Sequence, residues 1–257
     1  MNNNIHRVRI GAGKNLFFQH GLAANATQIS SLLSGLKGVS VHTLDCPGHG
    51  KSELMDNYIP SFNKYADLVV HSLDDQNVAR AIIGGLSMGS GIALNMALRY
   101  PERVRALVLH RSAWLDQKNP VNLKVLLAAV PIFRKDDRIE QFKNSAGFNF
   151  INDKYELAGK SLLGVFSQHQ QDCLGKVIKA MVGDRPIDNL EKLEKLINIP
   201  TLIIGNDNDP MHPFAISETL QQHIKDSVLK KVVSPYIDAE RHKKQVQLVI
   251  AEFLKNL

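Results

Sequence analysis

The sequence predicts an α/β fold with a mostly parallel central sheet that is covered by helices on both faces. Short β-rich runs alternate along the chain with segments of helical periodicity, which is the pattern typical of this fold class. Several of these runs are almost wholly apolar, such as Ala106–Leu109 and Thr201–Ile204, as strands buried on both faces require. The chain has 257 residues, 44% of them hydrophobic, which is enough to bury one large core.

The β-rich runs and helical periods fix the expected order of elements. The predicted strands are Ile5–Ile10, Asn15–Gln19, Val39–Leu44, Ala79–Gly84, Arg105–Leu109, Thr201–Gly205 and Val228–Val233. The predicted helices between and after them span about 25–37, 61–76, 88–100, 213–225 and 241–256.

One interval breaks this alternation. Between Ser112 and Asn198 no run qualifies as a strand, and several helical patterns follow one another. A helical insertion in an α/β chain is typical of a lid over a site, and the alternative is a structural subdomain with no pocket beneath it. We therefore predict a core domain of residues 1–111 and 199–257, with a helical lid of residues 112–198 inserted after the sixth strand.

The charge of the chain does not predict a nucleic-acid partner. Thirty-one basic and 25 acidic residues give a net charge of +6. The basic residues stand among acidic ones, as in Arg134–Arg138 and Glu191–Lys195, and such mixed runs form solvated helix faces. The sequence contains no nucleic-acid-binding motif. We expect no nucleic-acid partner.

The number of cysteines and the length of the apolar stretches indicate the cellular compartment in which we expect the protein. Cys46 and Cys173 are too few for a disulfide framework, so we expect free thiols in the cytoplasm. The N-terminus lacks the apolar segment of a secretory signal. The longest mostly apolar stretch, Leu123–Val130, is too short for a membrane span, which takes about 20 residues.

Metal-ligand spacings and nucleotide-binding motifs are missing, so no metal and no cofactor are predicted.

The segment Gly85-Leu86-Ser87-Met88-Gly89 predicts a nucleophile elbow. It follows an apolar strand and opens a helical pattern, which is the context that a catalytic serine turn needs. The turn is so tight that side chains two residues before and after the serine would collide. Glycine at both places therefore favours a catalytic role for Ser87.

The acid that would orient the base is expected at another strand end. Asp209 lies just beyond the predicted strand Thr201–Gly205, at the carboxyl edge where open α/β sheets place their sites. Asp207 in the same loop is the alternative. Either residue would also suit a simple turn.

A serine hydroxyl needs a base to remove its proton, and ten histidines compete for that role. We predict His242, because it follows the last strand in a segment that could bring its ring to the top of the sheet. His212 is the alternative, although it lies only three residues from Asp209, whereas the base of a triad normally comes from a different segment.

Ser87, Asp209 and His242 occur in the chain order Ser…Asp…His, and with further motifs this resembles the α/β-hydrolases. The further matches are His20-Gly21 after one strand and the turn from Asp45 to Ser52 after the next. The resemblance is to the lidded branch that cleaves esters and carbon–carbon bonds, and it covers about residues 14–111 and 199–257.

This resemblance implies a serine hydrolase with a Ser-His-Asp triad and an acyl-enzyme. Its oxyanion hole would consist of the backbone N–H groups of Leu22 and Met88. The substrate would be a small-molecule ester, thioester, lactone or activated carbon–carbon compound. His110 and Trp114, just beyond a strand end, are candidates to line the substrate pocket, and packing is the alternative role.

Two other functions remain open at this point. The same triad could serve a cofactor-free haloperoxidase or perhydrolase, or an acyltransferase. The scaffold could also be that of a non-catalytic ligand-binding protein, because a fold does not fix a function. The sequence makes no prediction about the oligomeric state.

Overall fold

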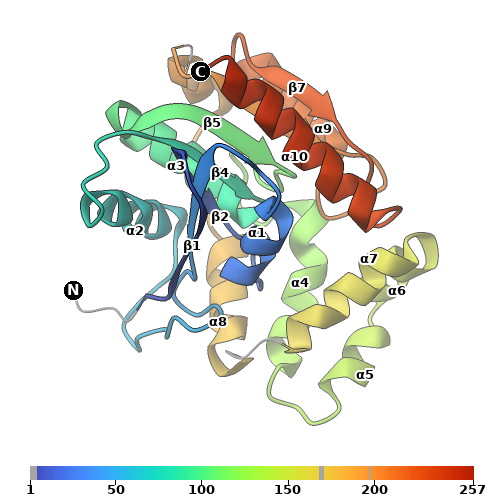
Figure 1. Cartoon of the computed structure of the whole chain (residues 1–257). Coiled ribbons are helices and arrows are strands. Elements are labelled where there is room, and N and C mark those ends of the chain that lie inside the picture. Colours follow the sequence, from blue (N-terminus) through green and yellow to red (C-terminus); the bar gives the residue numbers. More distant parts are fainter. Residues whose placement is uncertain (1–4, 168–170, 197) are drawn as a thin grey trace.

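The computed structural model describes residues 5–167, 171–196 and 198–257. A seven-stranded sheet in the order β1-β3-β2-β4-β5-β6-β7 forms its centre (Figure 1). Only β1 is antiparallel to its neighbour, β3, and the other pairs are parallel. The strands are β1 (Arg7–Gly11), β2 (Lys14–Gln19), β3 (Val39–Leu44), β4 (Ala81–Leu86), β5 (Val104–His110), β6 (Thr201–Gly205) and β7 (Val228–Lys231). The predicted fold class is confirmed.

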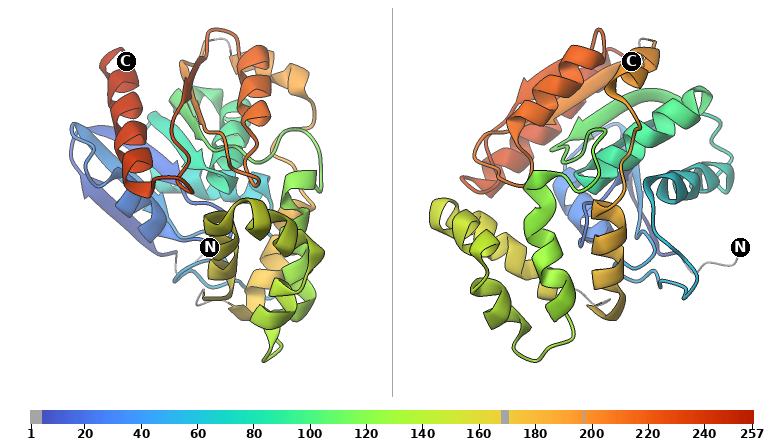
Figure 2. Two further views of the ribbon diagram at one scale, coloured as in Figure 1. Left: turned by 90° about the vertical axis from the view of Figure 1, so that its right-hand side faces the viewer. Right: turned by 180° about the vertical axis from the view of Figure 1, so that it is seen from behind.

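Helices cover both faces of the sheet because its strands present apolar side chains on both sides. Leu107 and Leu109 of β5 belong to one buried cluster, and Ala106 and Val108 belong to the other. The first cluster packs under α2 (Phe62–Asp74), α3 (Met88–Arg99) and α9 (Phe214–His223). The second packs under α1 (Ala26–Leu33) and α10 (Ala239–Lys255). Figure 2 shows α9 and α10 on opposite sides of β7.

The last helix, α10, shows how the sequence produces this arrangement. The side chain of Asp238 accepts a hydrogen bond from the Arg241 N–H and so caps its first turn. The residues buried on its inner face include Val246, Ile250 and, one turn from the start, His242. This helix has 17 residues. Among the described residues, no helix is long and apolar enough to cross a bilayer.

A run of short helices joins β5 to β6 and lies together at one end of the sheet (Figure 2). Its elements are η2 (Val121–Leu123), α4 (Lys124–Ala129), η3 (Val130–Ile132), α5 (Arg138–Lys143), α6 (Ala146–Lys154), α7 (Glu156–Leu163), η4 (Gly164–Ser167), α8 (Gln171–Val182) and η5 (Leu190–Leu196). The segment follows the fifth strand and not the sixth, because only β1 to β5 precede it among the described residues. The strands predicted before Ser112 also number five, so its predicted place after a sixth strand was wrong. A short turn, η1 (Pro101–Arg103), leads into β5.

Candidate active site

The predicted elbow forms the turn between β4 and α3. Ser87 has backbone angles of φ 57° and ψ −111°, a strained conformation for a residue with a Cβ. A Cβ at Gly85 would lie 2.1 Å from the carbonyl carbon of Gly89, and one at Gly89 would lie 2.1 Å from the carbonyl oxygen of Gln19. Both glycines are therefore required by the close approach of backbone atoms, and the turn presents the Ser87 hydroxyl at the start of α3.

Replacing Gly85 by alanine is expected to destabilise the protein by about 3 kcal/mol, because the backbone atoms that a Cβ would meet cannot move aside. The measurement is the free energy of unfolding in urea. Gly147→Ala in α6 is the matched control, because the atom nearest to its Cβ would be Cγ2 of Val125 at 3.4 Å, an ordinary van der Waals contact. A Gly85→Ala protein as stable as this control would show that the turn is not as tight as described.

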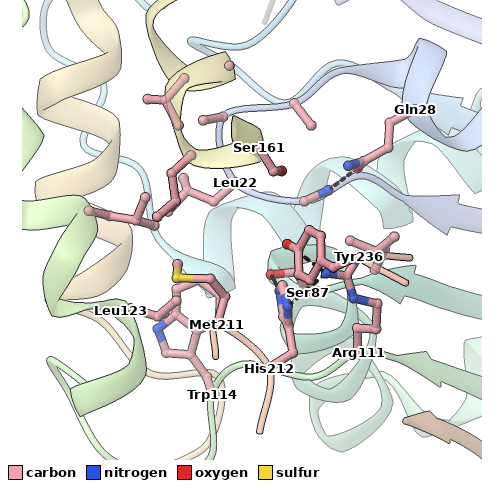
Figure 3. Close-up of a pocket in the computed structure, with 18 residues that line it drawn as sticks. Leu22, Gln28, Ser87, Arg111, Trp114, Leu123, Ser161, Met211, His212 and Tyr236 are labelled. Carbon is pink, nitrogen blue, oxygen red and sulfur yellow. Dashed lines mark hydrogen bonds between the residues drawn. The ribbon is translucent and has the colours of Figure 1, made fainter. Parts of the chain in front are cut away.

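The Ser87 hydroxyl is hydrogen-bonded to His212. The Nε2 atom of His212 lies 2.9 Å from the Ser87 Oγ atom, and its Nδ1 atom lies 2.9 Å from Oδ1 of Asp209 (Figure 3). Asp209 and His212 share one tight turn after β6, in which the backbone N–H of His212 donates to the carbonyl of Asp209. A serine, an imidazole and a carboxylate thus form one continuous chain of hydrogen bonds.

The structure corrects the prediction that His242 meets Ser87. The Nδ1 atom of His242 lies 2.7 Å from the carbonyl oxygen of Val233, and its ring stacks on His110 with 5.2 Å between centroids. The physical reason is that His242 belongs to the inner face of α10, which covers the sheet face opposite to α3. The hydrogen bond to Ser87 comes from the alternative residue, His212.

His110 does not line the substrate pocket, which was one of its two expected roles. Successive side chains of a strand point to opposite faces, so His110 follows Ala106 and Val108 toward α10. It is fully buried beside His242 and is not among the residues that line the cavity at Ser87. Packing, the alternative that the sequence left open, describes its position.

Of the two candidate acids, Asp209 is the one that contacts a histidine. Its side chain is completely buried. Asp207 instead forms an ion pair with Lys231, and about half of its side chain is exposed. The loop thus separates a buried carboxylate at the site from a solvated one at the surface.

Burial and charge set the protonation states of this pair. Burial opposes ionisation of Asp209, but the neighbouring His212 and Arg111 outweigh it and hold the pKa of that carboxyl well below its ordinary value. Burial lowers the pKa of His212, and the Arg111 guanidinium lowers it further, against the opposing effect of Asp209. At neutral pH the pair is therefore an ionised carboxylate and an uncharged imidazole, the states that a general base requires.

Comparison with known proteins decides the family. Residues 14–236 match the family model described as the alpha/beta hydrolase fold. The chain belongs to the alpha/beta hydrolase family. An uncharacterised hydrolase of Bacillus subtilis is 25% identical over 92% of this chain and 88% of its own length. A pimeloyl-[acyl-carrier protein] methyl ester esterase of Wigglesworthia glossinidia brevipalpis is 25% identical over 88% and 87%. A thermophilic esterase of Thermogutta terrifontis superposes with a TM-score of 0.77 at 19% identity, covering 98% of this chain and 93% of that one.

The two predicted oxyanion donors of this hydrolase fold lie beside Ser87. Met88 is the first residue of α3, and Leu22 lines the cavity at Ser87. Among the described residues, no hydrogen-bond acceptor is found for the backbone N–H of either one. The side chain of Gln28 accepts a hydrogen bond of 2.9 Å from the Gly21 N–H and so holds the Leu22 loop. The sequence carried no signal for this role of Gln28, because it depends on a tertiary contact.

Ser87 opens into a cavity of about 240 Å³ between the sheet and the helical segment. Figure 3 shows Trp114, Leu123 and Met211 on one side of Ser87 and Arg111 and Tyr236 on the other. Trp114 therefore occupies the lining position that the sequence predicted. The helical segment contributes Leu123, Leu126, Ser161, Leu162, Gly164 and Val165 to the wall. Among the described residues, no group of three His, Cys, Asp or Glu side chains is arranged to hold a metal ion.

The buried histidines predict how stability depends on pH. Burial lowers the pKa of His242 from 6.5 to about 4 in the folded protein. As pH falls below 6.5 the unfolded chain binds a proton that the folded protein does not, so stability is lost between pH 6.5 and 4. His242 alone accounts for up to about 3 kcal/mol of this loss. Urea unfolding of wild type and His242→Gln at pH 7.5 and 4.5 measures it, and equal losses in the two proteins would contradict the assignment.

Proposed function

We propose that this protein is a serine hydrolase in which Ser87 is the nucleophile, His212 the general base and Asp209 the residue that orients the base. The observation that carries the proposal is the chain of hydrogen bonds from the Ser87 Oγ atom through both ring nitrogens of His212 to Asp209, at the wall of a cavity. The arrangement provides what a serine nucleophile needs: a base within hydrogen-bond distance and a third group that orients that base.

The proposed reaction proceeds through an acyl-enzyme. His212 takes the proton of Ser87 while the Oγ atom attacks the substrate carbonyl, and the N–H groups of Leu22 and Met88 donate to the resulting oxyanion. The imidazolium then gives its proton to the leaving group as the bond to that group breaks. Water, activated by His212 in the same way, releases the acid and restores Ser87. Asp209 stays ionised throughout and stabilises the imidazolium.

The cavity favours a small acyl substrate. Its volume of about 240 Å³ is near the lower limit for small-molecule sites, and apolar side chains such as Trp114, Leu123 and Leu126 form much of the wall. One relative is a methyl ester esterase, which supports an ester as the bond that is cleaved. We further propose that residues 112–198 act as a lid on a core of residues 1–111 and 199–257, so that the helices set the acyl length.

Hydrolysis of a graded ester series tests the proposal. We expect the p-nitrophenyl esters of short acids, from acetate to hexanoate, to be cleaved with a single optimum of acyl-chain length. The kcat/KM values of lactones and thioesters are measured and compared with those of the esters. Peroxide and simple alcohols are added as competing acceptors. Release of mainly the free acid in their presence supports hydrolysis. If peracid or the transferred ester is instead the main product, the reaction is perhydrolysis or acyl transfer. No turnover of any member would contradict the proposal.

A further inference from the structure

One guanidinium connects three residues around Ser87. The Nε and Nη2 atoms of Arg111 both lie 2.7 Å from Oδ2 of Asp209. The same Nη2 atom lies 3.0 Å from the hydroxyl of Tyr236 and 3.2 Å from Nδ1 of His212 (Figure 3). The Arg111 side chain is only 10% exposed, so water screens these interactions weakly.

The two oxygens of the Asp209 carboxylate have different partners, and Oδ2 also accepts a longer hydrogen bond of 3.4 Å from the side chain of Asn206. Oδ2 accepts from Arg111, while Oδ1 faces both the ring Nδ1 and the backbone N–H of His212, at 2.9 and 3.2 Å. An ionised carboxylate only accepts hydrogen bonds, so Nδ1 of His212 carries the proton and Nε2 offers its lone pair to Ser87. Because Arg111 contacts Oδ2, the carboxylate cannot rotate away from the imidazole without losing the hydrogen bond from Nε and the ion pair with Nη2.

The position of Arg111 in the chain suits it to hold the site together. Asp209 and His212 share one loop after β6, whereas Ser87 follows β4, and Arg111 follows β5, the strand between those two. Its backbone N–H donates to the carbonyl of Ile204 at 2.8 Å. Its φ of +48° lies in the left-handed region that residues other than glycine rarely adopt. Such strain persists only where surrounding structure enforces it, and it is concentrated at functional sites.

The same guanidinium opposes a positive charge on His212. With the proton of His212 on Nδ1, the 3.2 Å contact between Nδ1 and Nη2 of Arg111 brings two N–H groups together. This contact is repulsive once the ring gains a second proton and becomes positively charged. Asp209 acts in the opposite direction and favours the imidazolium. Tyr236 is the acceptor of an Arg111 hydrogen bond. His110 and His242 lie behind the site, where burial lowers the pKa of both rings, that of His242 to about 4.

We propose that Arg111 is a positioning residue of this site, which locks the Asp209 carboxylate against His212 and keeps the imidazole uncharged until Ser87 gives up its proton. The inference rests on the proposed function, in which His212 is the base. As a consequence, the imidazole of His212 stays uncharged down to a lower pH than it would if only burial and Asp209 acted on it.

Two substitutions separate the role of the positive charge of Arg111 from the role of its contact with Oδ2 of Asp209 through two nitrogens. Arg111→Gln keeps a donor for Asp209 and removes the charge, so the acidic limb of the pH profile of kcat/KM moves to higher pH. Arg111→Lys keeps the positive charge but cannot contact Oδ2 of Asp209 through two nitrogens. The acidic limb of the kcat/KM profile therefore stays near its wild-type position. Both variants are expected to lose roughly 10- to 100-fold in kcat at pH 8, because a small displacement of the base costs this much.

Matched controls make the outcome decisive. Arg99→Gln removes another guanidinium that is paired with an aspartate, Asp67 at 2.7 Å, at the far end of α3, and it should leave both kcat and the profile unchanged. Thermal unfolding shows that each variant is folded. An acidic limb in Arg111→Gln that coincides with that of the wild type, or wild-type kcat in Arg111→Lys, would overturn the proposal.

A titration of His212 by NMR distinguishes this inference from the proposed function. The ring signals of His212 are followed against pH in resting wild type and Arg111→Gln, without substrate. We expect His212 to bind its proton at a higher pH in the variant, even if no ester were ever cleaved. Equal titration in the two proteins would overturn the role of Arg111, whereas a wild-type protein with no turnover would overturn the proposed function.

Discussion

Replacing His212 by alanine is expected to lower kcat for a short-chain ester by roughly 10⁶-fold, the loss that follows removal of the base from the serine protease subtilisin. The reason is that Nε2 of His212 is the ring nitrogen hydrogen-bonded to the Ser87 Oγ atom, and without it the hydroxyl has no acceptor for its proton. The measurement is steady-state kcat at pH 8, with circular dichroism to show that the fold is retained.

His242→Gln is the matched control for this prediction. A glutamine can still donate to the carbonyl of Val233, which His242 contacts at 2.7 Å, and the substitution leaves the hydrogen bond between Ser87 and His212 in place. We expect kcat within about tenfold of wild type, since the change lies outside the hydrogen-bonded chain. The reverse ranking, with His242→Gln inactive and His212→Ala active, would return the role of base to His242.

Replacing Ser87 by alanine is expected to reduce kcat by a similar factor of roughly 10⁶. The remaining activity would come from the oxyanion donors and from substrate binding, which together leave about 10³-fold acceleration over water in a triad without its nucleophile. Steady-state release of p-nitrophenol measures the loss, and mass spectrometry of the acid-quenched enzyme tests for the acyl adduct. Turnover by Ser87→Ala at more than a few per cent of wild type would exclude a covalent mechanism through this residue.

The double removal gives a further check on this prediction. Residues that act as one unit are strongly non-additive, so Ser87→Ala combined with His212→Ala should be no slower than either single variant. Additive losses would mean that the two side chains act independently, and the hydrogen bond between them would then have no role in the reaction.

The sheet was predictable because its strands carry their own signal. Apolar runs such as Ala106–Leu109 and Thr201–Ile204 are typical of strands that are buried on both faces. Glycine at 85 and 89 marks a turn that admits nothing larger. These are local properties of the chain. The fold and the position of Ser87 follow from them.

The partner of Ser87 was not predictable by the same reasoning. The expectation of His242 rested on its place after the last strand, but α10 begins at Ala239, so this residue already belongs to a helix that faces the other side of the sheet. The spacing of three residues between Asp209 and His212 was itself the signal, because a tight turn brings residues at that spacing together. The spacing argues against His212 only if the base has to come from a different segment than the acid.

The contributions of Gln28, Arg111 and Tyr236 could not be deduced from the sequence at all. Each depends on a tertiary contact between segments far apart in the chain, such as the 98 residues that separate Arg111 from Asp209. A single arginine after a strand has no pattern that distinguishes it from a surface cation. Its burial against a carboxylate becomes visible only once the ends of β5 and β6 lie side by side.

The rate at which a fluorophosphonate modifies Ser87 tests the identity of the base most directly, because the reaction needs an activated serine and no particular substrate. Intact-mass measurements follow one adduct per chain in wild type, His242→Gln and His212→Ala. We predict complete modification of Ser87 in the first two proteins at similar rates and a loss of several orders of magnitude in the third. Rapid modification of His212→Ala together with an unreactive His242→Gln would contradict the account.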